Sequence, residues 1–587
     1  MKTILIQGGL LSGCMVPFGI LNAQHSHPNV ILIMADDQGW GDLSHNGNTS
    51  VFTPNIDRIA QEGASFHNFY VCPVSSPTRA ELLTGRYAAR GGVRDVSRGG
   101  ERLNPDEVTI ADYFKKAGYT TAAFGKWHNG TQYPYHPNAR GFDEFYGFCS
   151  GHWGNYWQPM LEHNGEIVAG DGFIIDDLTT KAIEYIKEHQ ENPFFVYIPY
   201  NTPHSPMQVP DKWWNRVKDR EIKQRTTTGE DENLDFTKAA LALTENIDWN
   251  VGRIMLAIQE MALDEQTIIL YLTDNGPNSN RWNGGMKGRK GSTDEGGVRS
   301  PLFIRWPGHI PNGIEIKQLS GAIDLMPTLL ELSGNQMDFH NEIDGINLAP
   351  LLNNPDTTVL NRMLFSHWNN KTSVRIQDYL LDNEGLLYNT STDRSQRNVI
   401  ADKDKTNELI HGREWFNAQV VSLLSEKDAR PFTIGHPGEL YSKLPARDGT
   451  AYGSIERSNR YPNSSYFRNW KKTTDSICWN VQVEKDGRFE VFVYYTCAPE
   501  DIGSVIQLTV GENQLVSLLT AANDAPVLGA ELDRVPRAES YTKGFVPFSL
   551  GEITIHEGCK MVSLKANNIP GEEVMCCQML VFKRLSD

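Results

Sequence analysis

Four continuous apolar runs, each ending abruptly in polar residues, constrain the fold of this chain more than any other feature. A run of this kind is typical of a strand that is buried on both faces of a parallel sheet. The runs are Asn29–Met34, Tyr119–Phe124, Pro193–Ile198 and Thr267–Leu272. Helical patterns occur at 57–62, 110–117, 178–189 and 241–261, with a later packing helix at 325–330. Strands that alternate with helices predict an α/β fold, with a mostly parallel central sheet sandwiched by helices.

The residues that follow these runs carry most of the chemically reactive side chains in the predicted fold. In chain order they are Asp36 and Asp37, then Lys126 and His128, then His204, and finally Asp274 and Asn275. In an open α/β sheet, ligands bind beyond the carboxyl ends of the parallel strands. We therefore expect these side chains to meet at one shared site.

The chain is too long for one hydrophobic core: its 587 residues predict at least two domains. Strand-like segments at 363–367 and 373–387, closed by a helix around Trp415–Leu424, predict a small antiparallel subdomain. Beyond a linker near 428–437, β-rich runs separated by turn residues predict an appended all-β sandwich. These runs are Phe489–Tyr495, Val505–Val510, Leu515–Leu519, Met561–Ala566 and Met579–Lys583. The predicted domains are an α/β core at 25–360, the subdomain at 361–428 and the sandwich at 436–587.

The first 24 residues have the pattern of a secretory signal peptide. Lys2 gives a charged start, an apolar stretch follows, and Ala23 is a small residue near the expected cleavage point. Leu11–Cys14 also has the pattern of a bacterial lipobox, which would anchor the protein through a lipid on Cys14. We favour cleavage near Ala23, because the residues after Cys14 are apolar and would make a poor solvated tether. The sequence thus predicts a periplasmic or secreted protein, with an outer-membrane lipoprotein as the alternative, and predicts no transmembrane span.

The net charge excludes one class of binding partner, and the cysteine content bears on zinc sites and disulfides. The formal net charge of −17 argues against a nucleic-acid partner, which needs a basic surface. The chain has eight cysteines, without a C-x-x-C pair or zinc-type spacing among them. An oxidising compartment would allow a disulfide among the late cysteines, whose pairing the sequence leaves open. These are Cys478, Cys497, Cys559, Cys576 and Cys577.

The stretch at 72–86 has the pattern of a helix start. Ser76 can serve as the N-cap, a proline follows it at the first helical position, and Gly85 is a suitable terminator. Ser75 would then lie just outside the helix N-terminus, where free N–H groups and the helix dipole favour an anion. Arg79, one turn into the helix, adds a fixed positive charge near the same point.

Ser75, Pro77 and Arg79, followed at fixed distance by Leu83–Arg86, form a pattern that resembles the signature of the sulfatases. In this family, which belongs to the alkaline-phosphatase-like superfamily, a Cys or Ser of the signature is oxidised to formylglycine. Ser75 is in register with the signature and Cys72 is not, so Cys72 is expected to be a buried apolar residue. The resemblance implies a Ser-type, bacterial secreted member, on which a Ser-oxidising maturation enzyme acts.

The carboxylates at the strand ends resemble the metal ligands of the same family. Asp36, Asp37, Asp274 and Asn275 match those ligands position by position, and the modified Ser75 would be a further ligand. An isolated Asp-Asp pair would more often be a loop or a helix cap. Oxygen ligands of this kind suit Ca²⁺, with Mg²⁺ as the alternative, and disfavour zinc.

Three basic elements of the family also have counterparts in this sequence. Lys126 and His128 belong to a Gly-Lys-Trp-His sequence, and in an extended segment they point to the same side. His204 matches the histidine that follows the third strand. Lys290 fits the element Lys-Gly-x-x-x-Glu-Gly-Gly, whereas Lys287 has the wrong offset and is expected at the surface.

The resemblance implies hydrolysis of sulfate monoesters by a formylglycine nucleophile, which Arg79 would orient. Lys126, His128 and Lys290, together with the metal, would stabilise the negative charge of the sulfuryl group. His204 would protonate the departing alcohol, and His128 would be the base for release of sulfate. The alternatives are a phosphate or phosphonate ester hydrolase of the same fold, and a non-catalytic glycan-binding protein that uses the C-terminal β domain.

An aromatic cluster on a predicted loop is a candidate substrate wall, with ordinary core packing as the alternative. It consists of His152, Trp153, Asn155, Tyr156 and Trp157. Aromatic faces stack on sugar rings, so this loop, the predicted secretion and the appended β domain together favour a sulfated polysaccharide or glycan as the substrate.

Overall fold

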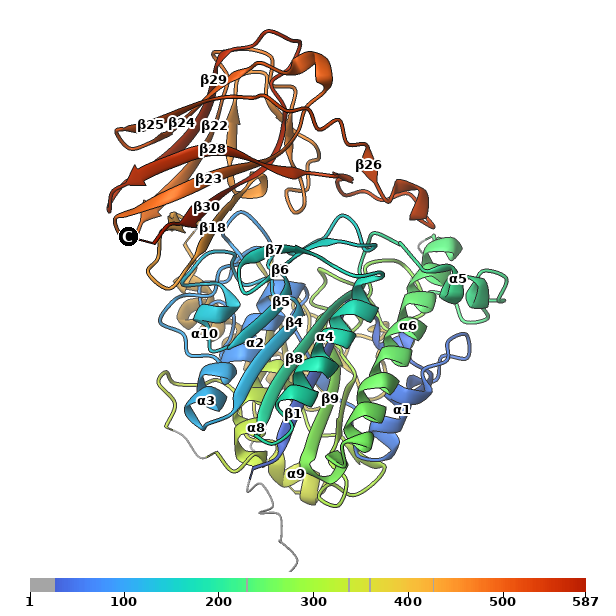
Figure 1. The fold of residues 1–587 in the computed structure, drawn as a ribbon. Coiled ribbons are helices and arrows are strands. Elements are labelled where there is room, and N and C mark those ends of the chain that lie inside the picture. The colour runs from blue at the N-terminus through green and yellow to red at the C-terminus, as the bar shows by residue number, and fades with distance from the viewer. Residues whose placement is uncertain (1–26, 228–230, 336–337, 358–360, 426, 587) are drawn as a thin grey trace, which may run out of the picture.

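The computed structural model describes residues 27–227, 231–335, 338–357, 361–425 and 427–586. The signal peptide predicted at 1–24 and the alternative lipid anchor at Cys14 lie outside these residues. Within them, the chain forms a large α/β body and an all-β body that lies above it in Figure 1. This architecture confirms the predicted fold class, an α/β core with an appended all-β domain.

A mixed ten-stranded sheet forms the centre of the α/β body. Its strands are β1 (Asn29–Asp36), β2 (Ala64–Phe66), β4 (Thr120–Lys126), β5 (Glu144–Phe148), β6 (Met160–His163), β7 (Glu166–Ala169), β8 (Phe194–Pro203), β9 (Thr267–Thr273), β10 (Leu302–Arg305) and β11 (Ile314–Ile316). They lie in the order β11-β2-β10-β9-β1-β8-β4-β5-β6-β7. β1 is parallel to β8 and β9, and β4 is parallel to β8 and β5, whereas antiparallel pairs occur towards both edges. The four apolar runs therefore form β1, β4, β8 and β9, within the parallel centre of the sheet.

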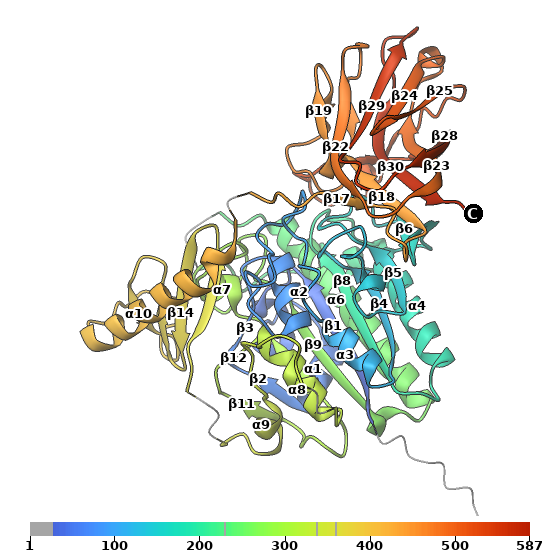
Figure 2. The ribbon, with the colours of Figure 1, turned by 90° about the vertical axis from the view of Figure 1, so that its left-hand side faces the viewer.

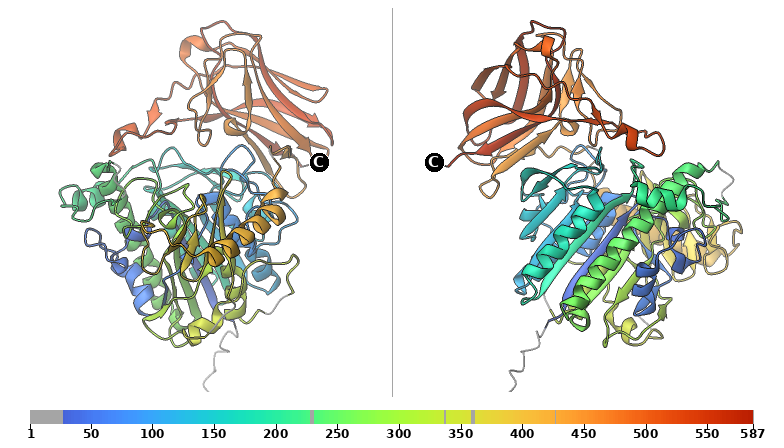
Figure 3. Two further views of the ribbon diagram at one scale, coloured as in Figure 1. Left: turned by 180° about the vertical axis from the view of Figure 1, so that it is seen from behind. Right: turned by 45° about the vertical axis from the view of Figure 1, so that its right-hand side comes forward.

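Every residue of β1 is buried, because helices cover both faces of the sheet. Its side chains alternate between two hydrophobic cores, with Ile31 and Ile33 in one and Val30 and Leu32 in the other. The first core includes residues of α1 (Pro54–Gln61), α4 (Ile174–Glu188), α5 (Asp211–Val217) and α6 (Leu234–Glu260). The second includes residues of α2 (Ser75–Thr84), α3 (Ile110–Lys116), α8 (Leu325–Leu332) and α9 (Ala349–Asn353). Figure 3 (right) shows α4 and α6 in front of the sheet.

Among the helices that begin earlier than their sequence patterns predict, α6 and α10 differ most from the prediction. α6 begins before residue 241, since Asn233 caps it by accepting a hydrogen bond from a backbone N–H of its first turn. α10 (Lys403–Gln419) begins well before Trp415 and has Asp402 as its N-cap. The first turns of α10 are polar and mostly exposed, so they lack the apolar spacing that indicates a helix.

A small antiparallel sheet lies beside the central one, as predicted (Figure 2). Its strands are β13 (Leu364–Trp368), β14 (Lys371–Ile376), β15 (Tyr379–Leu381) and β16 (Leu387–Asn389), and their pairings are antiparallel. α10 packs against this sheet through Leu409 and Phe416, and its C-cap residue Val420 belongs to the same hydrophobic cluster. Other short elements of the core are β3 (Phe69–Tyr70), β12 (Ser320–Gly321) and α7 (Glu295–Val298).

The C-terminal domain is a β-sandwich around a single hydrophobic core. One sheet contains β17 (Phe432–Ile434), β22 (Ser476–Val483), β29 (Met561–Asn568), β24 (Val505–Val510) and β25 (Asn513–Leu518), with β19 (Thr450–Tyr452) paired to β22. The other contains β20 (Glu456–Arg457), β21 (Phe467–Arg468), β30 (Cys576–Arg584), β23 (Gly487–Thr496) and β28 (Val546–Ile555), with β18 (Tyr441–Pro445) paired to β30. An arm with β26 (Val527–Leu528) and β27 (Thr542–Lys543) extends from it towards the core (Figure 1). The sandwich and its arm lie above the carboxyl ends of the parallel strands.

Among the described residues, no helix has the length and apolar character needed to cross a membrane. The cysteines of this part of the chain are all free thiols: Cys72, Cys149, Cys478, Cys497, Cys559, Cys576 and Cys577. The described residues therefore contain none of the disulfides that the sequence left open.

Candidate active site

The carboxyl ends of the parallel strands bring the predicted residues into one buried site. Asp36 ends β1, Lys126 ends β4, and Asp274 directly follows β9. Just beyond β1 and β4 the backbone turns through positive φ, 63° at Asp37 and 64° at His128. Residues other than glycine seldom adopt this conformation, and where they do they often belong to functional sites.

Ser75 is the first residue of α2 and not, as predicted, the residue before the N-cap. The N-cap is Val74, because the Ser76 hydroxyl donates to the carbonyl oxygen of Asp95 and does not cap the helix. Gly85 ends the helix as predicted, with a left-handed φ of 67°. The Ser75 side chain therefore starts within the first turn, still at the positive end of the helix dipole.

Two charged side chains hold the Ser75 hydroxyl. Ser75 Oγ donates to Asp274 Oδ2 at 2.6 Å and accepts a hydrogen bond from Arg79 Nε at 3.0 Å. Arg79 also donates to Asp274 Oδ2 at 3.1 Å and to the carbonyl oxygen of Lys126 at 2.8 Å. Ser75 is only 2% exposed, and Arg79 and Asp274 are fully buried. The hydroxyl oxygen is thus fixed next to the aspartate cluster.

The aspartate cluster has the donor set of a site for a hard cation. Asp36, Asp37 and Asp274 each place a carboxylate oxygen within 4.8 Å of the others. In the described structure, Asp36 Oδ1, Asp37 Oδ2 and Asn275 Oδ1 are buried without a hydrogen-bond partner. Buried polar atoms normally have partners, so unpaired oxygens gathered in one cluster suit the coordination of a cation. Burial and the charge of Asp36 raise the pKa of Asp274, which a bound cation would reverse. The residues fit Ca²⁺ or Mg²⁺, which take oxygen ligands.

Two lysines pair with the first two aspartates of the cluster. Lys126 Nζ lies 2.6 Å from Asp36 Oδ2, and Lys290 Nζ lies 2.7 Å from Asp37 Oδ1. Burial acts to raise the pKa of Asp37, but the charges of Lys290 and His204 lower it below its ordinary value. With Arg79, these lysines surround the cluster with positive charge, which favours an anionic ligand.

Lys290, not Lys287, reaches the cluster. The Lys287 side chain is 44% exposed and pairs with Asp294 at 3.3 Å and with Asp382 at 3.8 Å. The structure thus places Lys287 at the surface, where the sequence pattern predicts it.

Hydrogen bonds define how the two histidines present their ring nitrogens. His128 Nε2 lies 2.9 Å from the carbonyl oxygen of Val96 and must donate to it, so Nδ1 keeps a lone pair. Burial and the Lys126 charge lower the pKa of His128 well below its ordinary value. His204 Nδ1 lies 2.7 Å from the carbonyl oxygen of the next residue, and its Nε2 lies 3.6 Å from Asp37 Oδ2. Both effects favour the neutral form of His128 with its lone pair on Nδ1, and His204 presents Nε2 to the cluster.

The aromatic loop is divided between the site and the core. His152 approaches the site, with its ring centroid 5.5 Å from that of His204. Tyr156 is only 1% exposed, and its hydroxyl lies 3.0 Å from the carbonyl oxygen of His204 and 2.9 Å from that of Ser205. Tyr156 therefore supports the loop that carries His204 and does not form a substrate wall.

The other residues of the loop make packing and loop contacts. The Trp153 ring stacks on Phe148, and the Trp157 ring lies against Phe173. Asn155 Nδ2 donates to the carbonyl oxygen of Trp157 at 2.6 Å. Core packing, the alternative that the sequence left open, thus describes Trp153, Tyr156 and Trp157.

A residue of the C-terminal domain also reaches the site and was not predicted. Glu539 Oε1 accepts a hydrogen bond from Ser205 Oγ at 2.6 Å. Glu539 also lies within 4.8 Å of His152 and His204, measured between possible ligand atoms. No local pattern marks Glu539 in the sequence, and it stands 334 positions from its partner.

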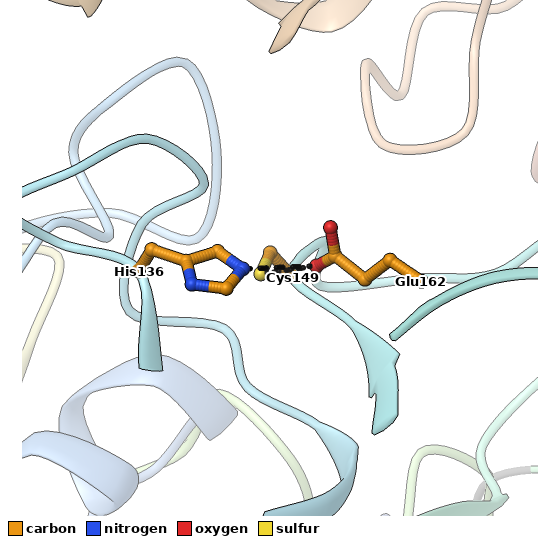
Figure 4. Close-up of side chains that lie close together, drawn as sticks. All are labelled: His136, Cys149 and Glu162. Atoms are coloured by element: carbon orange, nitrogen blue, oxygen red, sulfur yellow. Dashed lines mark hydrogen bonds and ion pairs between the residues drawn. The ribbon is translucent and has the colours of Figure 1, made fainter. Parts of the chain in front are cut away.

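A second group of potential metal ligands lies where the C-terminal domain contacts the core (Figure 4). Cys149 Sγ donates to Glu162 Oε1 at 2.9 Å, and His136 Nε2 lies 3.5 Å from the same oxygen. Lys443 of the C-terminal domain pairs with Glu162 Oε2. His136 Nδ1 accepts a hydrogen bond from the backbone N–H of Asn138, which leaves the ring proton on Nε2, towards Glu162. Lys443 thus supplies a positive charge that pairs directly with the Glu162 carboxylate.

The fold and the site together define an α/β protein in which positively charged side chains, a buried serine and a cluster of carboxylate oxygens meet at the carboxyl ends of the parallel strands. A sequence profile described as Sulfatase matches residues 28–335, and one described as N-sulphoglucosamine sulphohydrolase, C-terminal, matches residues 290–410. The chain belongs to the sulfatase family.

Similar proteins of known identity include two mammalian enzymes and one protein whose crystal structure contains a bound carbohydrate. The N-acetylgalactosamine-6-sulfatase of the dog (Canis lupus familiaris) is 32% identical over 361 residues, which cover 55% of this chain and 66% of that protein. Human (Homo sapiens) arylsulfatase A is 33% identical over 366 residues, which cover 55% of this chain and 68% of that protein. The crystal structure of Ps i-CgsB in complex with k-i-k-neocarrahexaose has a TM-score of 0.61 and 29% identity, covering 68% of this chain and 95% of that chain. The chain thus spans about two thirds of the length of the two mammalian relatives.

Proposed function

We propose that this protein hydrolyses sulfate monoesters, with an O-sulfate on a polysaccharide or glycan as the substrate. The observation that carries the proposal is the position of Ser75, whose hydroxyl is held by Arg79 and Asp274 at the start of α2. Orphaned oxygens of the aspartate cluster lie beside it, and Lys126 and Lys290 supply positive charge. This combination suits attack on an anionic ester.

The proposal includes oxidation of Ser75 to formylglycine by a maturation enzyme, and one Ca²⁺, or Mg²⁺, held by four side chains and the modified residue. The side chains are Asp36, Asp37, Asp274 and Asn275. When present, the formylglycine hydrate supplies the nucleophilic hydroxyl, and the cation stabilises negative charge as a Lewis acid.

The other residues of the site have distinct roles in the proposed reaction. Arg79 orients the side chain at position 75, while Lys126 and Lys290 bind the sulfate oxygens and stabilise the charge that they carry in the transition state. His204 presents Nε2 on the cluster side and donates a proton to the departing alcohol. His128 accepts a proton at Nδ1, the nitrogen that its hydrogen bond to Val96 leaves free.

The substrate class rests on the relatives and on the interdomain position of the site. The relatives include an N-acetylgalactosamine-6-sulfatase and a protein whose structure was solved in complex with a neocarrahexaose, and both of these names refer to carbohydrates. A glycan outside the cell would also agree with the predicted export of the protein to the periplasm or the medium.

Side-by-side assays and mass spectrometry test the proposed function. Purified protein from a host with a Ser-oxidising maturation enzyme should hydrolyse sulfate monoesters in preference to phosphate and phosphonate monoesters. The peptide that contains Ser75 should be lighter by two hydrogens in active material, as formylglycine requires. Preferential hydrolysis of phosphate or phosphonate esters would show instead a phosphate or phosphonate ester hydrolase. Unmodified Ser75 in fully active protein would refute the assignment of formylglycine as the nucleophile.

A further inference from the structure

The arm of the C-terminal domain is fixed to the loops that form the active site. Gln208 Nε2 donates to the carbonyl oxygen of Gly529 at 2.7 Å, at the start of the arm. Arg537 Nη1 donates to the carbonyl oxygen of Gly154 at 2.5 Å, next to the aromatic loop. Gly529 has a φ of +71°, and a Cβ there would lie 2.3 Å from Gln208 Nε2, so a side chain at this position would be strained and would collide with Gln208. The arm is therefore a built part of the active-site wall.

Glu539 is the residue that this arm brings to the site. Its Oε1 accepts the Ser205 hydroxyl at 2.6 Å, and it lies within 4.8 Å of His152 and His204, measured between possible ligand atoms. Burial acts to raise the pKa of Glu539, but the neighbouring histidines and the Ser205 hydroxyl lower it below its ordinary value. The arm thus places a carboxylate beside the group that faces the scissile ester.

His152 belongs to the α/β domain, faces Glu539, and has unused hydrogen-bonding capacity. It is only 4% exposed, and in the described structure neither ring nitrogen has a hydrogen-bond partner. Ser464 of the C-terminal domain holds its backbone, donating to the His152 carbonyl oxygen at 2.6 Å. A buried imidazole with two unpaired nitrogens is costly, so a ligand that donates to one nitrogen and accepts from the other would stabilise it.

We propose that Glu539 and His152 form a subsite for free hydroxyl groups of the sugar that carries the scissile sulfate, and that Glu539 rejects a second sulfate next to it. The inference rests on the proposed function, in which His204 protonates the leaving oxygen, so that the leaving sugar lies on the side of His152 and Glu539. A carboxylate accepts hydrogen bonds from hydroxyls and repels a sulfate at the same distance. The subsite therefore selects sugars with a single sulfate in this region, and its selectivity depends on the C-terminal domain.

The test compares Glu539→Gln with a matched control. Glu531→Gln removes the same charge from an exposed position on the same arm, in the 3-10 helix Ala530–Leu532. The substrates are the 4-sulfates and 6-sulfates of galactose and N-acetylgalactosamine, their 4,6-disulfates, and 4-nitrophenyl sulfate, which has no sugar. Binding of the two unsulfated sugars is measured separately by saturation-transfer NMR.

The wild type should hydrolyse a monosulfated sugar with a higher kcat/KM than the disulfate. Glu539→Gln should lower kcat/KM for that sugar by about 10- to 100-fold, mainly through KM, because a hydrogen bond to a charged group is lost. It should also raise the relative rate on the disulfate, reduce turnover of 4-nitrophenyl sulfate much less, and weaken binding of the unsulfated sugars. Glu531→Gln should behave as the wild type in every assay.

Two results would overturn the inference. One is an equal loss on sugar and aryl sulfates with an unchanged preference between monosulfate and disulfate. The other is undiminished binding of the unsulfated sugars by Glu539→Gln. Failure of the proposed function gives a different result, since the wild type would then hydrolyse none of the sulfate esters. In that case the NMR measurement of sugar binding would still test the role of Glu539, because it does not require the protein to hydrolyse a sulfate ester.

Discussion

Replacing Lys443 by methionine is expected to destabilise the protein through the ion pair that links its two domains. Lys443 is 5% exposed and Glu162 4%, so water cannot solvate the carboxylate that the variant leaves unpaired. Breaking a buried ion pair by removing one partner costs about 3–5 kcal/mol. Cys149 and His136 still face the carboxylate, so we expect a loss of about 3 kcal/mol, at the lower end of that range. Methionine keeps an apolar stem, so the loss measures charge more than packing.

The pH dependence of stability gives a second measure of the same pair. In the wild type, burial acts to raise the pKa of Glu162, but Lys443 and His136 lower it far below its ordinary value. A folded-state pKa below the unfolded one contributes stability that is present at neutral pH and is lost as the pH falls below about 4.3. Without Lys443, burial dominates and the folded-state pKa rises above the unfolded one. The folded variant then takes up a proton, so its stability relative to the wild type should increase as the pH falls from about 8 to about 5.

Urea unfolding at several pH values, followed by tryptophan fluorescence, measures both effects. Lys565→Met is the matched control, since Lys565 is an exposed lysine of β29 in the same domain. The double variant Lys443→Met/Glu162→Gln should regain part of the lost free energy of unfolding, because neither charge is then buried alone. The reasoning would be refuted if the double variant lost as much free energy of unfolding as Lys443→Met and Glu162→Gln lose in sum. It would also be refuted if Lys443→Met lost no more than the control Lys565→Met.

Three further predictions concern the active site. His204→Ala should lower turnover of a sugar sulfate by about 10²–10⁴-fold and turnover of 4-nitrophenyl sulfate much less, because nitrophenolate leaves without a proton. Equal losses of turnover on the two substrates would instead indicate that His204 binds the sulfate. Elemental analysis should find calcium bound to the purified protein and lost from Asp274→Ala together with activity, whereas stoichiometric zinc would contradict the oxygen-ligand site. Cys72→Ala should keep activity within about twofold of the wild type, because Cys72 is a buried packing residue. Ser75→Ala should abolish activity. A Cys72→Ala protein that is folded but inactive would count against the assignment of Ser75.

The centre of the fold and most of the site could be predicted because their signals are local. Each of the strands β1, β4, β8 and β9 is an apolar run whose last residues turn polar, and parallel strands bring those ends together. Asp36, Lys126 and Asp274 therefore meet in space although they are far apart in the chain. Ser75 is identified because it stands with Pro77, Arg79 and Leu83–Arg86 in a pattern that resembles the sulfatase signature, and this pattern lies within α2 and the two residues that follow it.

Features that depend on distant contacts could not be predicted. Glu539 lies in an arm without a regular pattern, and only the docking of the C-terminal domain brings it to Ser205. The N-cap of α2 was mispredicted because the Ser76 hydroxyl has a better partner in the carbonyl oxygen of Asp95. Tyr156 resembled a substrate-binding aromatic residue, but only the fold shows that its hydroxyl lies under the backbone at His204.

The place of β30 in its sheet sets the order in which this protein can be completed during translation. β30 is the last strand among the described residues, yet it lies between β21 and β23 in the interior of its sheet. The sandwich cannot close around its core before this strand leaves the ribosome, whereas residues 36–290 have emerged long before. Ser75 and the aspartate cluster can therefore assemble early, and the arm that carries Glu539 is secured only when β30 is inserted. A nonsense mutation within β30 would leave Ser75 and the aspartate cluster encoded in full and remove a central strand of the domain that supports the arm.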